Sequence, residues 1–262
     1  MRIRPSAVAG TFYPREAREL LATVDEHLSR GRVTDGIKAP KAIIAPHAGF
    51  IYSGPVAGSA YASLAARCKD ISRVVLVGPA HRVPFPGLAT SAASAFASPL
   101  GDVPLDRPCL AEWVASGLIR EFDAAHADEH SLEVQLPFLQ RLVPNAMIAP
   151  ILTGDGNSQA VEKLLDCAFG GDETLIVVSS DLSHYLPYAI AKGRDEATAR
   201  RLERIELNGA GHDDACGATA INGLLAVAAR RGLACQRLDL RNSGDTAGSR
   251  DQVVGYGAFA LG

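Results

Sequence analysis

The sequence predicts a single-domain, layered α/β fold in which helices flank a central, mostly parallel or mixed sheet. Short apolar runs alternate with segments of helical spacing along the whole chain, as expected when helices cover a sheet. No internal repeat, low-complexity linker or break in composition divides the 262 residues. One domain covering residues 1–262 is therefore the simplest account.

The predicted strands are apolar runs that are mostly rich in Val and Ile and mostly end at Gly, Pro or Ser. Continuous apolar runs of this kind are typical of strands buried on both faces. They cover residues 42–45, 74–77, 147–152, 175–178 and 253–261, and a further strand-like segment covers 234–240.

The predicted helices lie between these runs. They cover residues 15–30, 54–66, 131–142, 194–207 and 218–231. Pro55 suits the first turn of its helix, where no backbone N–H is needed. Pro137 is expected to kink or interrupt the third helix.

Composition excludes several classes of protein. The net charge of -3 and the pI of about 6.2 give no electrostatic attraction for nucleic acid or anionic membranes. The five cysteines are odd in number and form no C-x-x-C pair, which argues against a disulfide framework and a structural zinc site. The N-terminus lacks the apolar run of a signal peptide, and no stretch reaches the roughly 18 to 20 apolar residues that span a bilayer. We expect a cytoplasmic protein.

Three histidines share one placement, directly after a predicted strand. His47 follows the run 42–45, His81 follows 74–77, and His184 follows 175–178. Ligands of open α/β sheets bind outside the carboxyl ends of the strands, so these imidazoles are expected to meet at one edge. Neutral imidazole is both the commonest metal ligand and the best proton-transfer group near pH 7. A single histidine in such a loop is more often bonded to backbone, but three together favour a functional site.

Other polar residues near these histidines allow alternative interpretations. Asp181 could orient an imidazole, bind metal, or cap the following helix. Asp245 could bring a carboxylate to the same edge, or belong to an ordinary Ser-Gly-Asp turn. His130, beside Glu129, offers a fourth imidazole, or marks a helix start capped by Ser131.

Two histidines and one carboxylate with open positions form the ligand set of non-haem Fe(II) oxygenases. His47, His81 and Asp245 could provide it, and the same atoms would also serve zinc. Cys216 is expected to be a small buried residue at a helix start rather than a reactive thiol. The three other histidines, His27, His126 and His212, are expected at the surface.

Six ordered motifs then point to a family. They are Arg4 to Pro14, Pro46-His47-Ala48-Gly49 to Pro55, Gly78-Pro79-Ala80-His81, Glu129-His130-Ser131-Leu132-Glu133, Ser179 to His184, and Gly255-Tyr256. Together they resemble the Memo family, whose prokaryotic members are also known as the B protein of the AmmeMemoRadiSam system. The resemblance extends from about Arg4 to the last strand.

This resemblance implies a fold similar to the class III (LigB-type) extradiol dioxygenases, which open catechol rings with Fe(II) and dioxygen. It matches His47 and His81 to the two histidine ligands and His184 to the acid/base histidine. It matches His130 to a second pocket histidine and Asp181 to the pocket aspartate. For the third ligand the dioxygenases use a glutamate and the animal Memo protein a cysteine. Here Asp245 or Thr246 lies near the matching position.

Three functions follow as hypotheses. The first is an Fe(II) oxygenase acting on a small aromatic substrate; Zn or Cu could replace the iron. In this enzyme His184 would take a proton from the substrate, Asp181 would orient His184, and His130 would assist. The second is a non-catalytic metal- or peptide-binding adaptor, since one family member is known as a phosphotyrosine-peptide adaptor. The resemblance implies radical SAM and AMMECR1-like proteins as partners. The third is a zinc hydrolase with the same ligand types.

Overall fold

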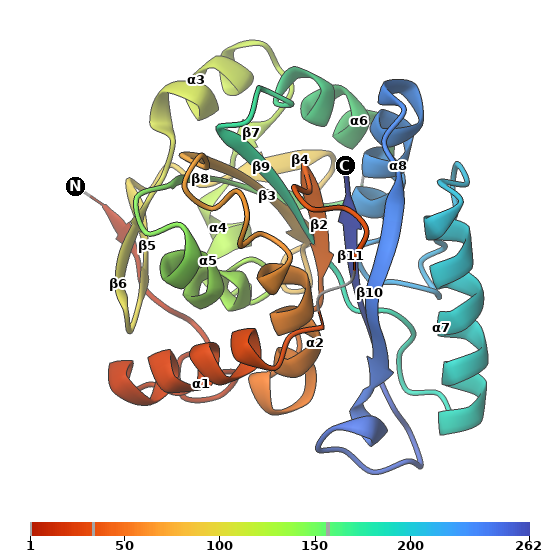
Figure 1. Cartoon of the computed structure of the whole chain (residues 1–262). Coiled ribbons are helices and arrows are strands. Elements are labelled where there is room, and N and C mark those ends of the chain that lie inside the picture. The colour runs from red at the N-terminus through yellow and green to blue at the C-terminus, as the bar shows by residue number, and fades with distance from the viewer. Residues whose placement is uncertain (1, 33–34, 156–157) are drawn as a thin grey trace.

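The computed structural model describes residues 2–32, 35–155 and 158–262, and its central element is an eight-stranded sheet (Figure 1). The strand order is β10-β11-β2-β9-β3-β8-β4-β7. The four middle strands are parallel and buried; they are β2 (Ala42–Ala45), β9 (Thr174–Ser179), β3 (Arg73–Pro79) and β8 (Met147–Thr153). The predicted layered α/β fold with a central, mostly parallel or mixed sheet is confirmed.

Shorter or antiparallel strands complete both edges. On one side β11 (Gly255–Leu261) runs antiparallel to β2, and β10 (Cys235–Asn242) runs antiparallel to β11. On the other side lie β4 (Leu88–Thr90) and β7 (Arg120–Glu121). A separate small sheet joins β1 (Ile3–Arg4), β5 (Ala95–Ser98) and β6 (Gly101–Pro104). Strands β10 and β11 correspond to the predicted segments 234–240 and 253–261. The short strands lack a continuous apolar run and were not predicted; they are β1, β4, β5, β6 and β7.

Helices cover both faces of the sheet (Figure 1). One layer contains α1 (Ala17–Ser29), α2 (Phe50–Ala62) and α5 (Leu136–Leu142). The opposite layer contains α6 (Ser158–Cys167), α7 (Tyr188–Glu203) and α8 (Ala218–Arg231). The remaining short helices are α3 (Arg107–Ala115), α4 (Asp123–Ala127), η1 (Glu133–Gln135) and η2 (Ser243–Asp245).

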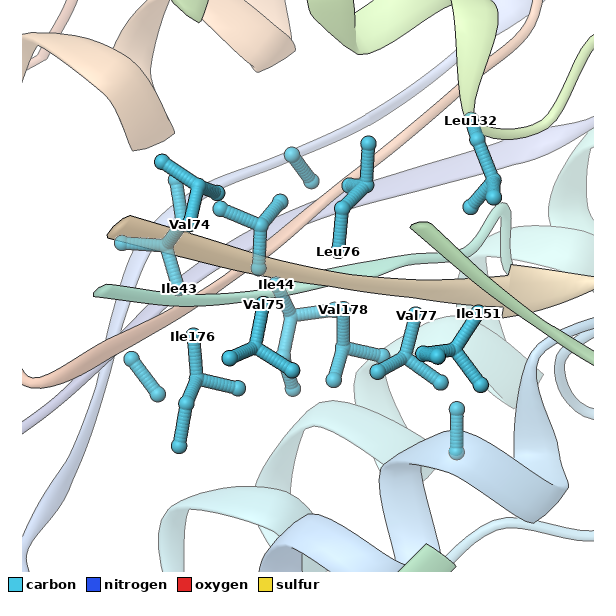
Figure 2. Packing of buried hydrophobic residues seen from close by; sticks show 14 of the residues in the cluster. Ile43, Ile44, Val74, Val75, Leu76, Val77, Leu132, Ile151, Ile176 and Val178 are labelled. Atoms are coloured by element: carbon cyan, nitrogen blue, oxygen red, sulfur yellow. The ribbon is translucent and has the colours of Figure 1, made fainter. Parts of the chain in front are cut away.

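Alternate residues of the central strands fill the two layers (Figure 2). Val74 and Leu76 of β3 point to the side of Leu132, whereas Val75 and Val77 point to the opposite side. All these side chains are at most 2% exposed, so both faces of β3 lie in hydrophobic core.

The predicted helices all exist; α8 has the predicted ends, and the other helices have shifted ends. Helix α2 begins at Phe50, four residues before the expected start, so Pro55 lies inside it. Pro137 does not kink a long helix; it stands in the first turn of α5, after the 3-10 turn η1. No helix among the described residues is long and apolar enough to cross a membrane.

The N-terminal motif is anchored on one buried carboxylate. Arg4 Nη1 lies 2.5 Å from Glu133, Tyr13 Oη donates to it at 2.6 Å, and the backbone N–H groups of Ala7 and Val8 donate at 2.8 and 3.0 Å. Both charged partners are buried. This segment therefore has a structural role that explains its motif.

The surface placement expected for His126 was wrong. Its side chain is 2% exposed, and its Nε2 lies 3.2 Å from the carbonyl oxygen of Ala89. His27 is only half-buried, and His212 is exposed as expected.

Candidate metal centre

The sheet topology brings the three predicted loops to one edge. Strand β9 lies between β2 and β3 and is parallel to both, so the carboxyl ends of all three strands are neighbours. His47 follows the end of β2, His81 the end of β3, and Asp181 and His184 the end of β9.

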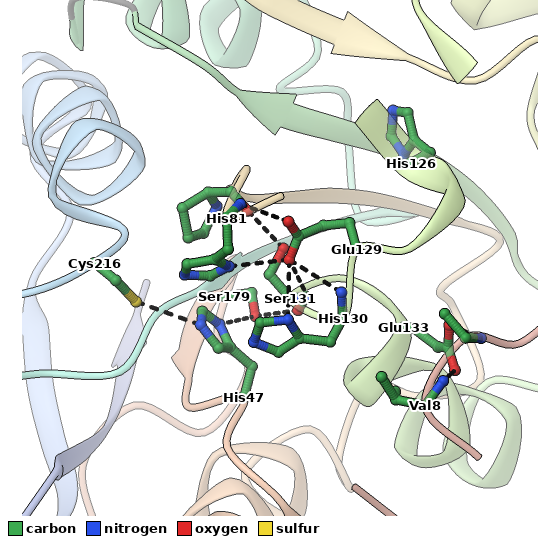
Figure 3. A network of polar contacts seen from close by, with 12 residues as sticks. Val8, His47, His81, His126, Glu129, His130, Ser131, Glu133, Ser179 and Cys216 are labelled. Atoms are coloured by element: carbon green, nitrogen blue, oxygen red, sulfur yellow. Dashed lines mark hydrogen bonds and ion pairs between the residues drawn. The ribbon is translucent and has the colours of Figure 1, made fainter. Parts of the chain in front are cut away.

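Three imidazoles form one cluster at this edge (Figure 3). Ring centroids lie 5.3 Å apart for His47 and His81, 5.5 Å for His47 and His130, and 4.7 Å for His81 and His130. His184 lines the same cavity but belongs to neither group of potential metal ligands among the described residues. The structure therefore separates His184 from the imidazoles that could share an ion.

The sulfur of Cys216 completes the cluster. It lies 3.3 Å from His47 Nε2, and the ligand atoms of His47, His81 and Cys216 are all within 4.8 Å of one another. A Cβ on the next residue, Gly217, would lie 2.6 Å from Ser180 Cβ, so glycine permits this close approach to the end of β9. Two imidazoles and a thiol are ligands suited to zinc, copper or iron.

Asp245, the expected carboxylate ligand, lies elsewhere. Its Oδ1 accepts a hydrogen bond from Tyr188 Oη at 2.6 Å, and its Oδ2 accepts one from the Asn242 backbone N–H at 3.1 Å. It lines a different, charged cavity. Thr246 Oγ1 is bonded to the carbonyl oxygen of Ser243. We correct the third ligand of the set from Asp245 to Cys216, because Asp245 is held in the η2 turn as its capping carboxylate.

Glu129 orients His81. Its Oε1 lies 2.9 Å from His81 Nδ1, and its Oε2 accepts the His81 backbone N–H at 2.5 Å. Burial raises the pKa of Glu129, but the hydrogen bonds from the His81 side chain and backbone outweigh it and bring the pKa to about 2. An ionised carboxylate accepts the proton of Nδ1, which leaves the Nε2 lone pair of His81 free for a metal.

A second group of potential ligands combines Glu129 with His81 and His130. However, Oε1 of Glu129 already accepts the backbone N–H groups of His130 and Ser131, each at 3.0 Å, besides facing His81 Nδ1. Its lone pairs are committed to these donors. We therefore assign Glu129 an orienting role.

Asp181 holds the loop of His47 and does not contact His184 through any described hydrogen bond. Its Oδ1 accepts the His47 backbone N–H at 2.8 Å, and its own backbone N–H points to Cys216 Sγ at 3.3 Å. Asp181 thus ties together two of the three potential ligands. The sequence predicted that Asp181 orients His184; the described hydrogen bonds of Asp181 instead connect the His47 loop with Cys216.

Burial favours the neutral form of the groups in the cluster. It lowers the pKa of His47 well below its usual value and that of His130 to about 4, with smaller effects from neighbouring imidazoles and carboxylates. It also lowers the pKa of His184. Burial, reinforced by the charge of Asp181, raises the pKa of Cys216 to about 12. His47 and His130 are therefore neutral at pH 7, as metal binding requires, whereas the thiol of Cys216 must release its proton on metal binding.

The cluster opens onto a cavity of about 770 Å³. Its walls carry the aromatic rings of Phe12, Tyr52, Tyr185 and Tyr256, and Arg82 also lines it. Phe12 belongs to the anchored N-terminal segment and lies 4.7 Å from the His130 ring, centroid to centroid. A smaller cavity of about 260 Å³ reaches His81 and Cys216 and is also lined by Thr153 and Thr219.

Fold and site together define an α/β protein with a histidine–cysteine cluster at the carboxyl edge of its sheet. The chain belongs to the Memo family, because the family model described as Memo-like protein matches residues 4–260. Relatives named MEMO1 family protein include one from Aquifex aeolicus, 34% identical with 98% of both chains covered, and one from Ignicoccus hospitalis, also 34% identical with 98% of both covered. One from Pyrobaculum aerophilum is 33% identical over 99% of both chains.

Proposed function

We propose that this Memo-family protein is a metal-dependent oxygenase that binds Fe(II) through His47, His81 and Cys216 and acts on a small aromatic substrate. The observation that carries the proposal is the set of three ligand atoms within 4.8 Å of one another, beside a large cavity with aromatic walls. Zinc and copper suit the same donors and are the alternatives to iron.

The donor set fits a metal ion in three respects. Protein ligands bond to zinc at roughly 2.0–2.3 Å, so neighbouring ligand atoms only a few ångströms apart, such as His47 Nε2 and Cys216 Sγ at 3.3 Å, can share one ion. Burial lowers the pKa of His47 well below its usual value, so this imidazole is neutral at pH 7. Glu129 supplies the outer carboxylate that commonly orients a metal-bound histidine. When bound, Fe(II) would supply redox chemistry with dioxygen at its open coordination positions.

The remaining cavity residues define what the chain itself would do. A planar substrate ring would pack against the aromatic side chains of Phe12, Tyr52 and Tyr256, since aromatic rings favour stacked and edge-to-face contacts with one another. His184 would accept the proton of a substrate hydroxyl, because burial keeps its imidazole neutral. His130 borders the same space beside His81 and would donate or accept a hydrogen bond there. Asp181 would hold the His47 loop in place.

Metal analysis and oxygen uptake test the proposal. Protein produced without a histidine tag is analysed for metal, then loaded with Fe(II) without oxygen and mixed with catechol and dioxygen. We expect one metal per chain and catechol-dependent oxygen consumption, both lost in the double variant His47→Ala, His81→Ala. Protein that binds no metal stoichiometrically and consumes no oxygen would contradict it.

The adaptor function predicted from the family resemblance gives a different outcome. Stable complexes with radical SAM or AMMECR1-like proteins that survive the same double substitution would favour binding over catalysis. We further propose a cytoplasmic location, where Cys216 would stay reduced.

A further inference from the structure

A chain of neutral hydrogen bonds runs from the core to His47. Tyr61 Oη donates to Gln135 Oε1 at 2.9 Å, and Gln135 Nε2 donates to Ser179 Oγ at 2.8 Å. Ser179 Oγ lies 2.9 Å from His47 Nδ1. Tyr61, Gln135 and Ser179 are completely buried, and His47 is 1% exposed. The side chains of Tyr61, Gln135 and Ser179 are thus shielded from solvent, which cannot replace a lost partner.

Two backbone carbonyls fix the direction of this chain. Gln135 Nε2 lies 3.0 Å from the carbonyl oxygen of Pro46, and a carbonyl oxygen only accepts, so this atom of the amide must be the nitrogen. Ser179 Oγ donates at 2.6 Å to the carbonyl oxygen of Ser131. The hydroxyl has one proton, which this bond uses. Ser179 can therefore only accept from Gln135 and from His47.

The tautomer of His47 follows from that restriction. Since Ser179 accepts, Nδ1 of His47 carries the proton, and Nε2 keeps its lone pair. That lone pair points to the Cys216 sulfur at 3.3 Å, as expected if an S–H donates to it when no metal is bound.

We propose that Gln135 and Ser179 are positioning residues that hold His47 in the Nδ1–H tautomer and so direct its Nε2 lone pair to the metal. The proposal rests on the proposed metal-binding function and deepens it. His81 is oriented by an ionised carboxylate, whereas His47 is oriented by a neutral hydroxyl. A neutral acceptor polarises the Nδ1–H bond less than a carboxylate does, so His47 would donate less electron density to the metal than His81.

The two histidines differ in burial and in the support that their partners receive. The His81 side chain is 30% exposed, and its buried partner Glu129 is stabilised as a carboxylate by the backbone N–H groups of His81, His130 and Ser131. His47 is enclosed by the core, where an unpaired charge would be costly. The serine–glutamine relay orients the ring without placing a charge there.

The tautomer is measured first, in metal-free protein labelled with ¹⁵N-histidine. At pH 8, where ordinary histidines are neutral, long-range ¹H–¹⁵N spectra distinguish a protonated from an unprotonated ring nitrogen. We expect wild-type His47 to show a protonated Nδ1 and an unprotonated Nε2. A protonated Nε2 in the wild type would overturn the proposal, whatever the variants do.

Variants then test each member of the relay. Ser179→Ala removes the acceptor and should shift His47 toward a mixture of tautomers, and Ser179→Thr, which restores a hydroxyl, should reverse the shift. Gln135→Met should have a smaller effect, because Ser131 still takes the hydroxyl proton. Ser59→Ala, at another completely buried serine outside the site, is the control and should leave the His47 signals unchanged. An unchanged tautomer in Ser179→Ala would contradict the relay.

Metal affinity gives the second readout. Competition titration with Zn(II) should show a roughly 10–100-fold loss in Ser179→Ala, the usual cost of removing an outer-shell partner, and normal affinity in Ser59→Ala. Equal affinity in Ser179→Ala and wild type would refute the role toward the metal. If the wild type binds no metal, the proposed function fails, while the tautomer measurement, made without metal, still decides the relay.

Discussion

The sulfur of Cys216 lies 3.3 Å from Nε2 of His47, although 169 positions separate the two residues in the sequence. The contact joins the loop after β2 to the residue pair that precedes α8. It makes Cys216, and not Asp245, the third potential ligand.

Replacing Cys216 should therefore weaken metal binding strongly. Cys216→Ala removes a direct ligand atom and should cost more than the ~10–100-fold that loss of an outer-shell partner costs. Asp245→Asn is the matched control, since that carboxylate serves Tyr188 and the η2 turn. Competition titration with a chromophoric chelator measures both. A larger effect from Asp245→Asn would reverse our assignment.

His184 should affect turnover without affecting metal binding. It lines the cavity but stands in neither ligand group. His184→Ala should lower kcat with catechol by ~10²–10⁴, the range for loss of a general acid–base group, and leave the metal content at one ion per chain. Parallel metal analysis and oxygen-uptake assays separate the two effects. Loss of the metal in this variant would show that His184 is a ligand.

Asp181 should make the metal-free protein less stable as pH rises. Burial raises its pKa to about 7, so folding takes up a proton between the ordinary pKa of aspartate and about 7. The contribution of Asp181 to the free energy of unfolding should then fall over about pH 4 to 7, whereas the buried histidines, whose pKa values are lowered, act in the opposite direction. Asp181→Asn removes this dependence and keeps an oxygen acceptor for the His47 N–H. The variant should gain up to about 4 kcal/mol over wild type at pH 8.

Urea unfolding at pH 5 and pH 8 measures this dependence. Asp70→Asn, at an exposed carboxylate, serves as the control and should follow the wild type at both pH values. A wild type and an Asp181→Asn variant with parallel pH profiles would mean that Asp181 is ionised throughout.

The carboxylate of Glu133 should contribute strongly to stability. Glu133→Ala leaves Arg4 buried without its partner and removes the acceptor of Tyr13, so we expect a loss of ~3–5 kcal/mol in the free energy of unfolding. Glu112→Ala, at an exposed position of α3, should change it little. Urea unfolding compares the two. A loss in Glu133→Ala as small as that in the control would mean that the N-terminal segment is held by its apolar contacts.

Sequence patterns predicted the parallel strands and the major helices because these elements are buried and regular. Strand β9 could be read from the run 175–178, and α8 begins and ends at the predicted residues. The short strands β4 to β7 carry no such run, and their pairing depends on contacts distant in sequence. Pro137 was expected to kink or interrupt the helix over residues 131–142. The segment is interrupted, since α5 begins only at Leu136 and Pro137 stands in its first turn.

The part of the site that follows the ends of predicted strands could be predicted from the sequence. His47 and His81 follow parallel neighbours of β9, and sheet topology then brings them together. Cys216 follows a turn, not a strand, so no periodicity points to the edge of the sheet; the only signal was the cysteine ligand of the animal Memo protein. The prediction of Asp245 as a ligand was wrong because capping hydrogen bonds within η2 hold its carboxylate, and residue spacing does not reveal these bonds. The radical SAM and AMMECR1-like partners stay predictions.

Adjacent serines at the end of β9 serve opposite layers of the protein. Ser179 faces His47, while Ser180 Oγ accepts the backbone N–H of Gly217, at the start of α8. The imidazoles and the thiol are thus carried by different halves of the fold. Local opening of the α8 layer alone would remove the Cys216 sulfur and leave the two histidine ligands. The dissociation rate of a bound metal ion would therefore depend on how often the α8 layer separates from the sheet.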